Sequence, residues 1–142
     1  MLNSLPYDRK VTPLHAFIAS SLATFREEGV LNYAIVTKAM ENVGRRLRTL
    51  YGLDGQPVEV ILKSNKVLRL AEYLEVEEDP QYIFTKILTK SCNICPRAVG
   101  GLELPGRLCP FPGLLSGLTG LKPDLEGTKR EGDFCKIILF KV

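Results

Sequence analysis

Near residue 74 the spacing of apolar residues changes, and this change limits the possible folds more than anything else in the chain. Before it, apolar residues recur at i, i+3 and i+4, which is the spacing of amphipathic helices. After it, they alternate or form short runs rich in Ile, Phe, Tyr and Thr, which is typical of strands. Helices followed by strands predict an α+β domain rather than an alternating α/β domain.

The first half predicts three helices. Thr12 is placed to cap the first helix, and Pro57 suits the first position of the third. Gly29 and Gly52 are expected to end the first and second helices. We expect these helices over residues 13–28, 31–51 and 57–73.

The second half predicts two β-hairpins with a short helix inserted between them. Apolar side chains on both faces of the second and last strands predict central strands that are covered on both sides. The expected fold is therefore a set of N-terminal helices packed on an antiparallel sheet of about four strands, in one domain over residues 1–142. We expect strands over 74–77 and 81–90, the helix over 112–121 and the second hairpin over 124–142.

Charge and hydropathy argue against several classes of protein. The net charge is +3, too small to favour a nucleic-acid partner. No apolar run reaches the roughly 18 residues that a membrane helix needs. The first ten residues lack the basic-then-apolar order of a signal peptide, which favours a cytoplasmic location.

The four cysteines are the main candidates for chemistry. In a cytoplasmic chain such a set is more often a metal or redox site than a disulfide framework. Two intervening residues let Cys92 and Cys95 face one tetrahedral ion, so zinc is the candidate cofactor. An iron–sulfur or partial site, a redox dithiol at Cys92 and Cys95, and four independent thiols remain open. The candidate metal ligands are Cys92, Cys95, Cys109 and Cys135.

Other residues offer little for catalysis. His15 is the only histidine, and its apolar neighbours favour a hydrogen-bonded or surface role. The chain has no phosphate-binding loop, dinucleotide fingerprint or hydrolase motif. We therefore expect no enzyme, although thiol oxidation and reduction through Cys92 and Cys95 is the activity that the residues come nearest to. Gly113, Gly117 and Gly120 give the short helix a smooth side, which allows its backbone to approach the sheet or a ligand closely, and close packing is the favoured reading.

The C-terminal part of the chain carries a resemblance. Residues 109–118 read CPFPGLLSGL, and they are followed by Glu126, by Gly132-Asp133 and by Cys135. This pattern, over roughly residues 88–142, resembles the 4-vinyl-reductase domain family. Members of that family look like small-molecule or hydrocarbon-binding modules and share an α/β fold with TRAPP transport-complex subunits. The chain departs from the family at Lys129, where the family's E-x-x-C motif has its cysteine.

These observations predict a protein that binds or senses a hydrophobic small molecule in a pocket between the helices and the sheet. The alternative is a non-catalytic scaffold or dimerisation subunit without a ligand. The apolar surface of the helical half also favours a homodimer, since two-fold pairing hides the same patch on both copies. The candidate pocket residues are Phe17, Leu22, Ile35, Val43, Phe84 and Leu118.

Overall fold

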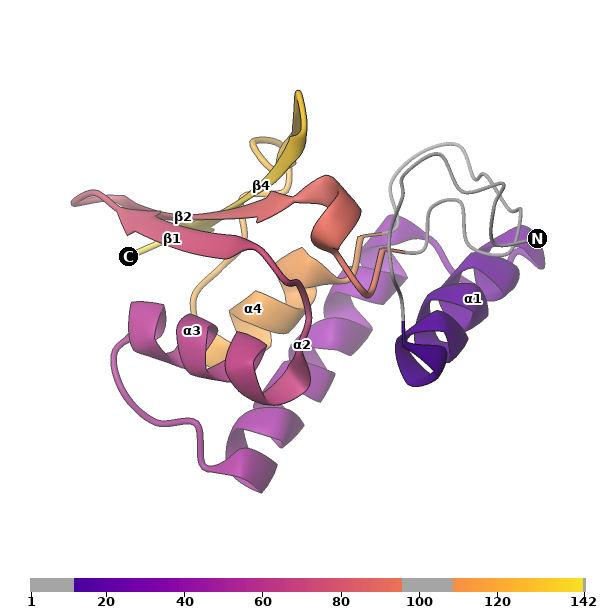
Figure 1. The fold of residues 1–142 in the computed structure, drawn as a ribbon, viewed down its shortest axis with the longest axis horizontal. Coiled ribbons are helices and arrows are strands. Elements are labelled where there is room, and N and C mark those ends of the chain that lie inside the picture. Colours follow the sequence, from indigo (N-terminus) through magenta and orange to yellow (C-terminus); the bar gives the residue numbers. More distant parts are fainter. Residues whose placement is uncertain (1–11, 96–108, 142) are drawn as a thin grey trace.

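The computed structural model describes residues 12–95 and 109–141, so much of the predicted loop over 91–113 lies outside the described residues. Within them the helices and strands follow the predicted order (Figure 1). In chain order the elements are α1 (Pro13–Glu27), α2 (Tyr33–Tyr51), α3 (Pro57–Leu68), β1 (Leu74–Glu78), β2 (Tyr82–Leu88), the 3-10 turn η2 (Thr89–Ser91), α4 (Phe111–Thr119), β3 (Lys129–Glu131) and β4 (Phe134–Phe140).

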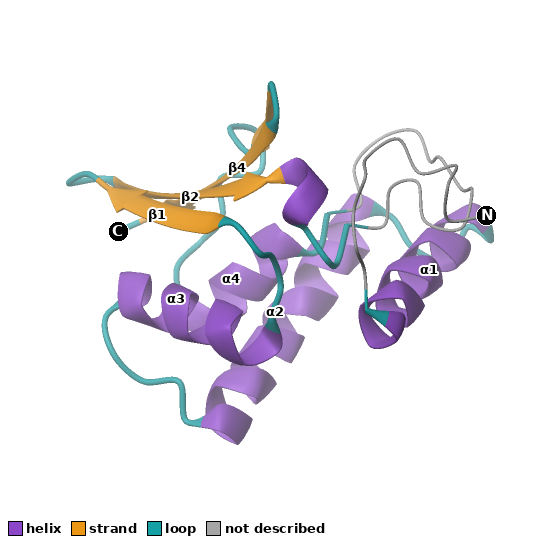
Figure 2. Ribbon diagram, in the orientation of Figure 1, coloured by secondary structure: helices purple, strands orange, loops and turns teal. Residues whose placement is uncertain are grey.

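The four strands form one antiparallel sheet in the order β1-β2-β4-β3 (Figure 2). The chain leaves β2, forms α4 and returns as the second hairpin, so that β4 pairs with β2. Ile87 of β2 lies opposite Cys135 of β4 in this pairing. The arrangement confirms the predicted α+β fold, with a helix between two hairpins.

The third helix ends earlier than the predicted end at Tyr73. Its last residue is Leu68, and Arg69 follows in the left-handed region at φ 53° and ψ 50°. The Arg69 N–H donates to the Asn65 carbonyl at 2.8 Å and closes the last turn. The apolar spacing continues beyond this point, but the backbone turns away there and leads into β1.

The helices lie on one side of the sheet, with α4 next to the strands (Figure 1). Every residue from Phe111 to Leu118 is buried, as expected for a helix that is apolar around its whole circumference. Ile83 of β2 and Leu139 of β4 are 1% and 0% exposed on the inner face of the sheet. The main core therefore lies between the sheet, α3 and α4.

Glycines bring the backbones of α2 and α4 into direct contact. A Cβ atom added to Gly117 would lie 2.1 Å from the Glu41 carbonyl oxygen, and one added to Gly113 would lie 2.2 Å from the Thr37 carbonyl oxygen. On α2, a Cβ at Gly44 would lie 2.5 Å from the Leu114 carbonyl oxygen. Gly113 and Gly117 therefore serve close packing, but against α2 rather than against the sheet, and a Cβ at Gly120 would meet nothing within 4 Å.

The prediction that β2 and β4 are covered on both faces is wrong for the outer face, because no described helix lies on it. Tyr82 and Phe84 of β2 are only half-buried, and Phe140 of β4 is 37% exposed. Each of these rings contacts another, and the Lys136 ammonium lies 4.6 Å from the centre of the Phe84 ring. Aromatic rings and lysine side chains thus shield this face without a second layer.

In the described ranges, every helix is too short or too polar to cross a lipid bilayer.

Candidate functional site

An apolar cavity of about 420 Å³ lies among the helices. Its walls come from α1, α2, the end of α3, the segment after η2 and the start of α4, and none of its lining residues belongs to a strand. The cavity therefore lies beside the main core rather than between the helices and the sheet as predicted. Its lining residues are Leu14, His15, Ile18, Leu22, Met40, Val43, Leu47, Leu68, Leu70, Ile94, Pro110 and Leu114.

His15 is the one titratable residue in this lining. Its Nε2 lies 3.1 Å from the Leu68 carbonyl oxygen, and its Nδ1 is hydrogen-bonded to the Thr12 hydroxyl. Because a carbonyl oxygen only accepts, Nε2 donates to Leu68. The Nε2 bond holds α1 against the end of α3, and the Nδ1 bond stays within the N-cap of α1. Both ring nitrogens thus have partners, as the hydrogen-bonded reading of this histidine predicted.

Two of the six predicted pocket residues, Leu22 and Val43, line the cavity. The other four lie elsewhere. Phe17 and Ile35 are 68% and 46% exposed, and Leu118 is fully buried in the core around α4. Phe84 lies on the outer face of the sheet.

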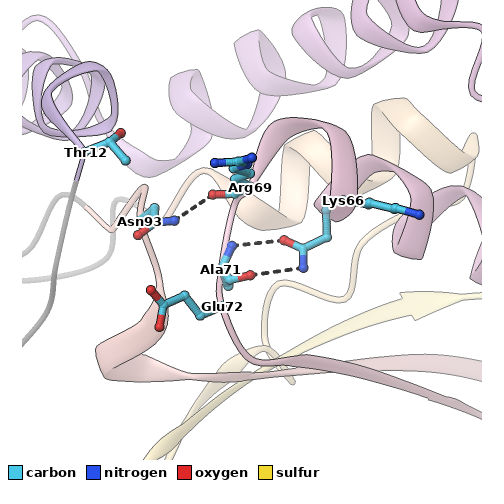
Figure 3. Close-up of a pocket in the computed structure, with 7 residues that line it drawn as sticks. Thr12, Lys66, Arg69, Ala71, Glu72 and Asn93 are labelled. Atoms are coloured by element: carbon cyan, nitrogen blue, oxygen red, sulfur yellow. Dashed lines mark hydrogen bonds between the residues drawn. The ribbon is translucent and has the colours of Figure 1, made fainter.

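A second, polar pocket of about 400 Å³ lies next to the end of α3 (Figure 3). The Asn65 side chain pairs with the backbone of Ala71, accepting from its N–H at 2.9 Å and donating to its carbonyl at 3.1 Å. Asn93 Nδ2 donates to the Arg69 carbonyl at 2.6 Å. The lining residues are Thr12, Asn65, Lys66, Arg69, Ala71, Glu72 and Asn93.

The sequence did not predict the polar pocket. Its residues are ordinary surface types, and they meet only because Arg69 reverses the direction of the backbone. The one sequence feature that could have indicated this pocket is Arg69, a polar residue between Leu68 and Leu70 at the end of a helix.

All four cysteines contact the main core. Cys92 is buried, and its backbone forms an isolated bridge with that of Ala71. Cys95 and Cys109 border the part of the chain outside the described residues. Cys135 lies on β4, with its sulfur 3.3 Å from the Thr89 hydroxyl oxygen. All four are thiols, and none is in a disulfide.

Burial raises the pKa of the Cys109 thiol well above its usual range. The nearby thiol of Cys92 raises this pKa further, and Cys95 and Cys135 add smaller contributions. A hydrogen bond from the Phe111 N–H acts in the opposite direction. The other three thiols are thus close enough to Cys109 to influence its ionisation. With its pKa raised in this way, Cys109 is protonated at neutral pH.

In the two described ranges, no three side chains of His, Cys, Asp or Glu lie close enough together to hold a metal ion. The structure therefore brings the thiols near one another without forming a coordination sphere.

Comparison with known proteins finds one family and no solved structure that matches. The chain is 41% identical over 44 residues to the uncharacterized protein MJ0207 of Methanocaldococcus jannaschii, a stretch that covers 31% of this chain and 28% of that relative. Neither the family nor this relative is described as a 4-vinyl-reductase domain. The family model matches residues 29–141, most of the described structure, and the chain belongs to the MJ0207 family.

Proposed function

We propose that this protein binds an apolar small molecule in the cavity between α1, α2 and the ends of α3 and α4, rather than catalysing its conversion. The observation that carries the proposal is the chemistry of the lining, which is aliphatic except for His15. His15 already uses both ring nitrogens in hydrogen bonds. Burying the apolar surface of a ligand against this lining is favourable by about 25 cal/mol for each Å² removed from water.

The size of the cavity and the attachment of α1 support the same proposal. A volume of about 420 Å³ is within the range of roughly 300–1,000 Å³ that is common for ligand pockets. The helix α1 supplies four lining residues, and Leu22 holds it through a small cluster with Val36 on α2. The C-terminal resemblance to 4-vinyl-reductase domains, whose members look like small-molecule-binding modules, agrees with this function.

To test the proposal, a larger side chain is introduced on α1 so that it fills the cavity. Ile18 lines the cavity and its more exposed neighbour Phe17 does not, so Ile18→Trp and Phe17→Trp place the same side chain inside and outside the cavity lining. Binding of the neutral dye Nile red is measured by fluorescence titration. We expect Ile18→Trp to weaken binding at least about tenfold because the indole occupies the ligand volume, and Phe17→Trp to bind like the wild type.

The protein has no natural tryptophan, so the emission of each variant reports where its indole lies. A blue-shifted emission for Ile18→Trp would show that the indole has entered the cavity. The proposal fails if the wild type takes up neither Nile red nor any co-purifying apolar compound. It also fails if a buried indole at position 18 leaves the affinity unchanged.

We propose in addition that Cys92, Cys95, Cys109 and Cys135 bind one zinc ion. Four sulfur donors are a preferred set for structural zinc, and a reducing cytoplasm would keep them as thiols. The support is their position around one part of the core. Binding would draw the sulfurs closer together than they lie in the structure and would displace the Cys109 proton.

Elemental analysis after dialysis against weak chelator tests the zinc site. About one equivalent of zinc per chain is expected, and Cys135→Ser should reduce it several-fold without loss of the helices. Less than about a tenth of an equivalent in the wild type would rule out the site. In that case, rapid alkylation of Cys92 alone at neutral pH would favour the redox dithiol instead.

A further inference from the structure

The polar pocket beside the end of α3 is a separate site from the apolar cavity. The two share no lining residue, so what binds in the polar pocket does not depend on the proposed function. Its volume of about 400 Å³ is within the range of roughly 300–1,000 Å³ that is common for ligand pockets. The hydrogen-bond donors and acceptors of its lining determine which class of ligand it can hold.

The backbone acceptors around this pocket are already occupied. The four consecutive carbonyl oxygens of residues 68–71 all accept hydrogen bonds, and the side-chain oxygen of Asn65 accepts from the Ala71 N–H at 2.9 Å. In chain order the four carbonyls accept from His15 Nε2 at 3.1 Å, Asn93 Nδ2 at 2.6 Å, the Asn93 N–H at 2.8 Å and Asn65 Nδ2 at 3.1 Å. This part of the lining is therefore a fixed wall with little remaining capacity to bind a cation.

The side chains that remain available are mainly cationic. Lys66, Arg69 and Glu72 line the pocket and are exposed. Among the described residues, none of these three side chains takes part in an ion pair or a hydrogen bond. Two cations against one carboxylate favour an anion, and the planar guanidinium has paired donors that match a carboxylate or a phosphate. The side chains of Arg69 and Glu72 extend in opposite directions from the segment around Ala71, so the guanidinium is available to an incoming group (Figure 3).

A backbone conformation that disfavours side chains places Arg69 at this pocket. Arg69 is the only described residue other than glycine with a positive φ, at 53°. Glycine would adopt this conformation without the steric cost that arginine incurs. The conformation is fixed on both sides, because the Arg69 N–H donates to the Asn65 carbonyl and its carbonyl accepts from Asn93 Nδ2. Strain that the surroundings hold in this way is characteristic of functional positions.

We propose that the polar pocket binds a small hydroxylated anion, whose carboxylate or phosphate group pairs with Arg69 and is supported by Lys66. The pocket is larger than a bare phosphate ion, so the ligand carries a further polar part. Asn93 is buried and its Nδ2 is committed to the Arg69 carbonyl, which leaves its Oδ1 to accept from a hydroxyl group. The Glu72 carboxylate offers a second acceptor of the same kind. A polyol phosphate and a hydroxy acid both belong to this class.

The test compares three probes with the same three-carbon frame, namely glycerol phosphate, glycerate and neutral glycerol. Heteronuclear NMR follows the Arg69 Nε–H and the Asn93 side-chain amide while each probe is added. We expect the anions to shift both signals saturably and to bind at least about tenfold more tightly than glycerol. This preference should decrease as salt is raised, because Arg69 is exposed to solvent. The anion that binds more tightly identifies the head group as carboxylate or phosphate.

The Arg69→Gly variant separates recognition from folding. It removes the guanidinium and also relieves the strained backbone, so its melting temperature should equal or exceed that of the wild type. We expect it to bind the anions at least about tenfold more weakly, and to bind Nile red as before because Arg69 does not line the apolar cavity. Lys66→Gln, at an exposed position on α3, should weaken anion binding several-fold. Arg46→Gln, which removes one positive charge from the exposed surface of α2, should leave it unchanged.

Three results would overturn this inference, and none of them affects the proposed function. The first is equal affinity of the wild type for glycerol and both anions, which includes the absence of binding. The second is anion binding that survives both Arg69→Gly and Lys66→Gln. The third is an equal loss of affinity in Arg46→Gln and Arg69→Gly, which would show that anions are attracted to surface charge in general and not to this pocket.

Discussion

The two sides of α2 are packed in opposite ways. On the side of α4, glycines bring the helix backbones so close that there is no room for a Cβ atom at Gly113 or Gly117. On the side of α1, the buried cluster consists of Leu22 and Val36, and an apolar cavity remains open beside it. The outer face of α1 also leaves Phe17 68% exposed.

This difference separates a rigid part of the molecule from an adaptable one. Backbone contact through glycine fixes one distance between two helices, because any added atom forces them apart. Side chains that meet loosely around a cavity can adjust to a ligand at little cost. We therefore expect α2 and α4 to determine the stability of the fold, and α1 to determine what the protein binds.

The largest effect is expected at the contact between α2 and α4. Gly117→Ala places a methyl group 2.1 Å from the Glu41 carbonyl oxygen, and backbone on both helices must move to accommodate it. We expect a loss of about 3 kcal/mol or more in the free energy of unfolding, measured by urea denaturation. Thr24→Ala, at an exposed position on α1, should change the same quantity by less than about 0.5 kcal/mol. A loss below about 1 kcal/mol for Gly117→Ala would show that the two helices separate easily.

A smaller and local effect is expected on the other side of α2. Leu22→Ala removes the main apolar contact of α1, and the free energy of opening α1 should decrease by about 2 kcal/mol. Hydrogen exchange should become faster in α1 while the amides of β2 and β4 keep their protection. As a control, Leu115→Ala in the fully buried α4 should speed exchange throughout the described structure. If Leu22→Ala also exposes the amides of the sheet, α1 is part of the rigid region.

The smallest effect concerns association through the outer face of α1. We expect the wild type to be a homodimer that hides Phe17 and its exposed neighbour Phe25. Phe17→Lys should weaken the dimer about tenfold or more, and Leu62→Lys, at an exposed position on α3, should not. Light scattering and sedimentation measure both. A wild-type mass near 15.8 kDa across the micromolar range would contradict the dimer.

Periodicity was sufficient to predict the elements and their order. The change of spacing near residue 74, the Thr12 cap and the stop at Gly52 all correspond to observed features. The end of α3 was missed because the apolar spacing continues past Arg69, and only the left-handed backbone at that residue shows that the helix has stopped.

The cavity was harder to predict than the fold. Apolar residues surround much of α1, so spacing alone cannot tell that Ile18 lines the cavity and Phe17 does not. In β2, alternation separates Phe84 from Ile83 but does not say which face the helices cover. The spacing of the cysteines showed that two of them can meet, whereas the approach of Cys109 and Cys135 depends on the tertiary fold.

The central position of α4 has a consequence for how the protein is made. Ribosomes synthesise the chain from the N-terminus, so α2 and α3 emerge well before the helix that fills the space between them and the sheet. The strand β4, which completes the pairing of β2, emerges later still. The apolar faces of α2 and α3 therefore stay unsatisfied until α4 and β4 have been translated, and during that interval the nascent chain exposes surface that can aggregate.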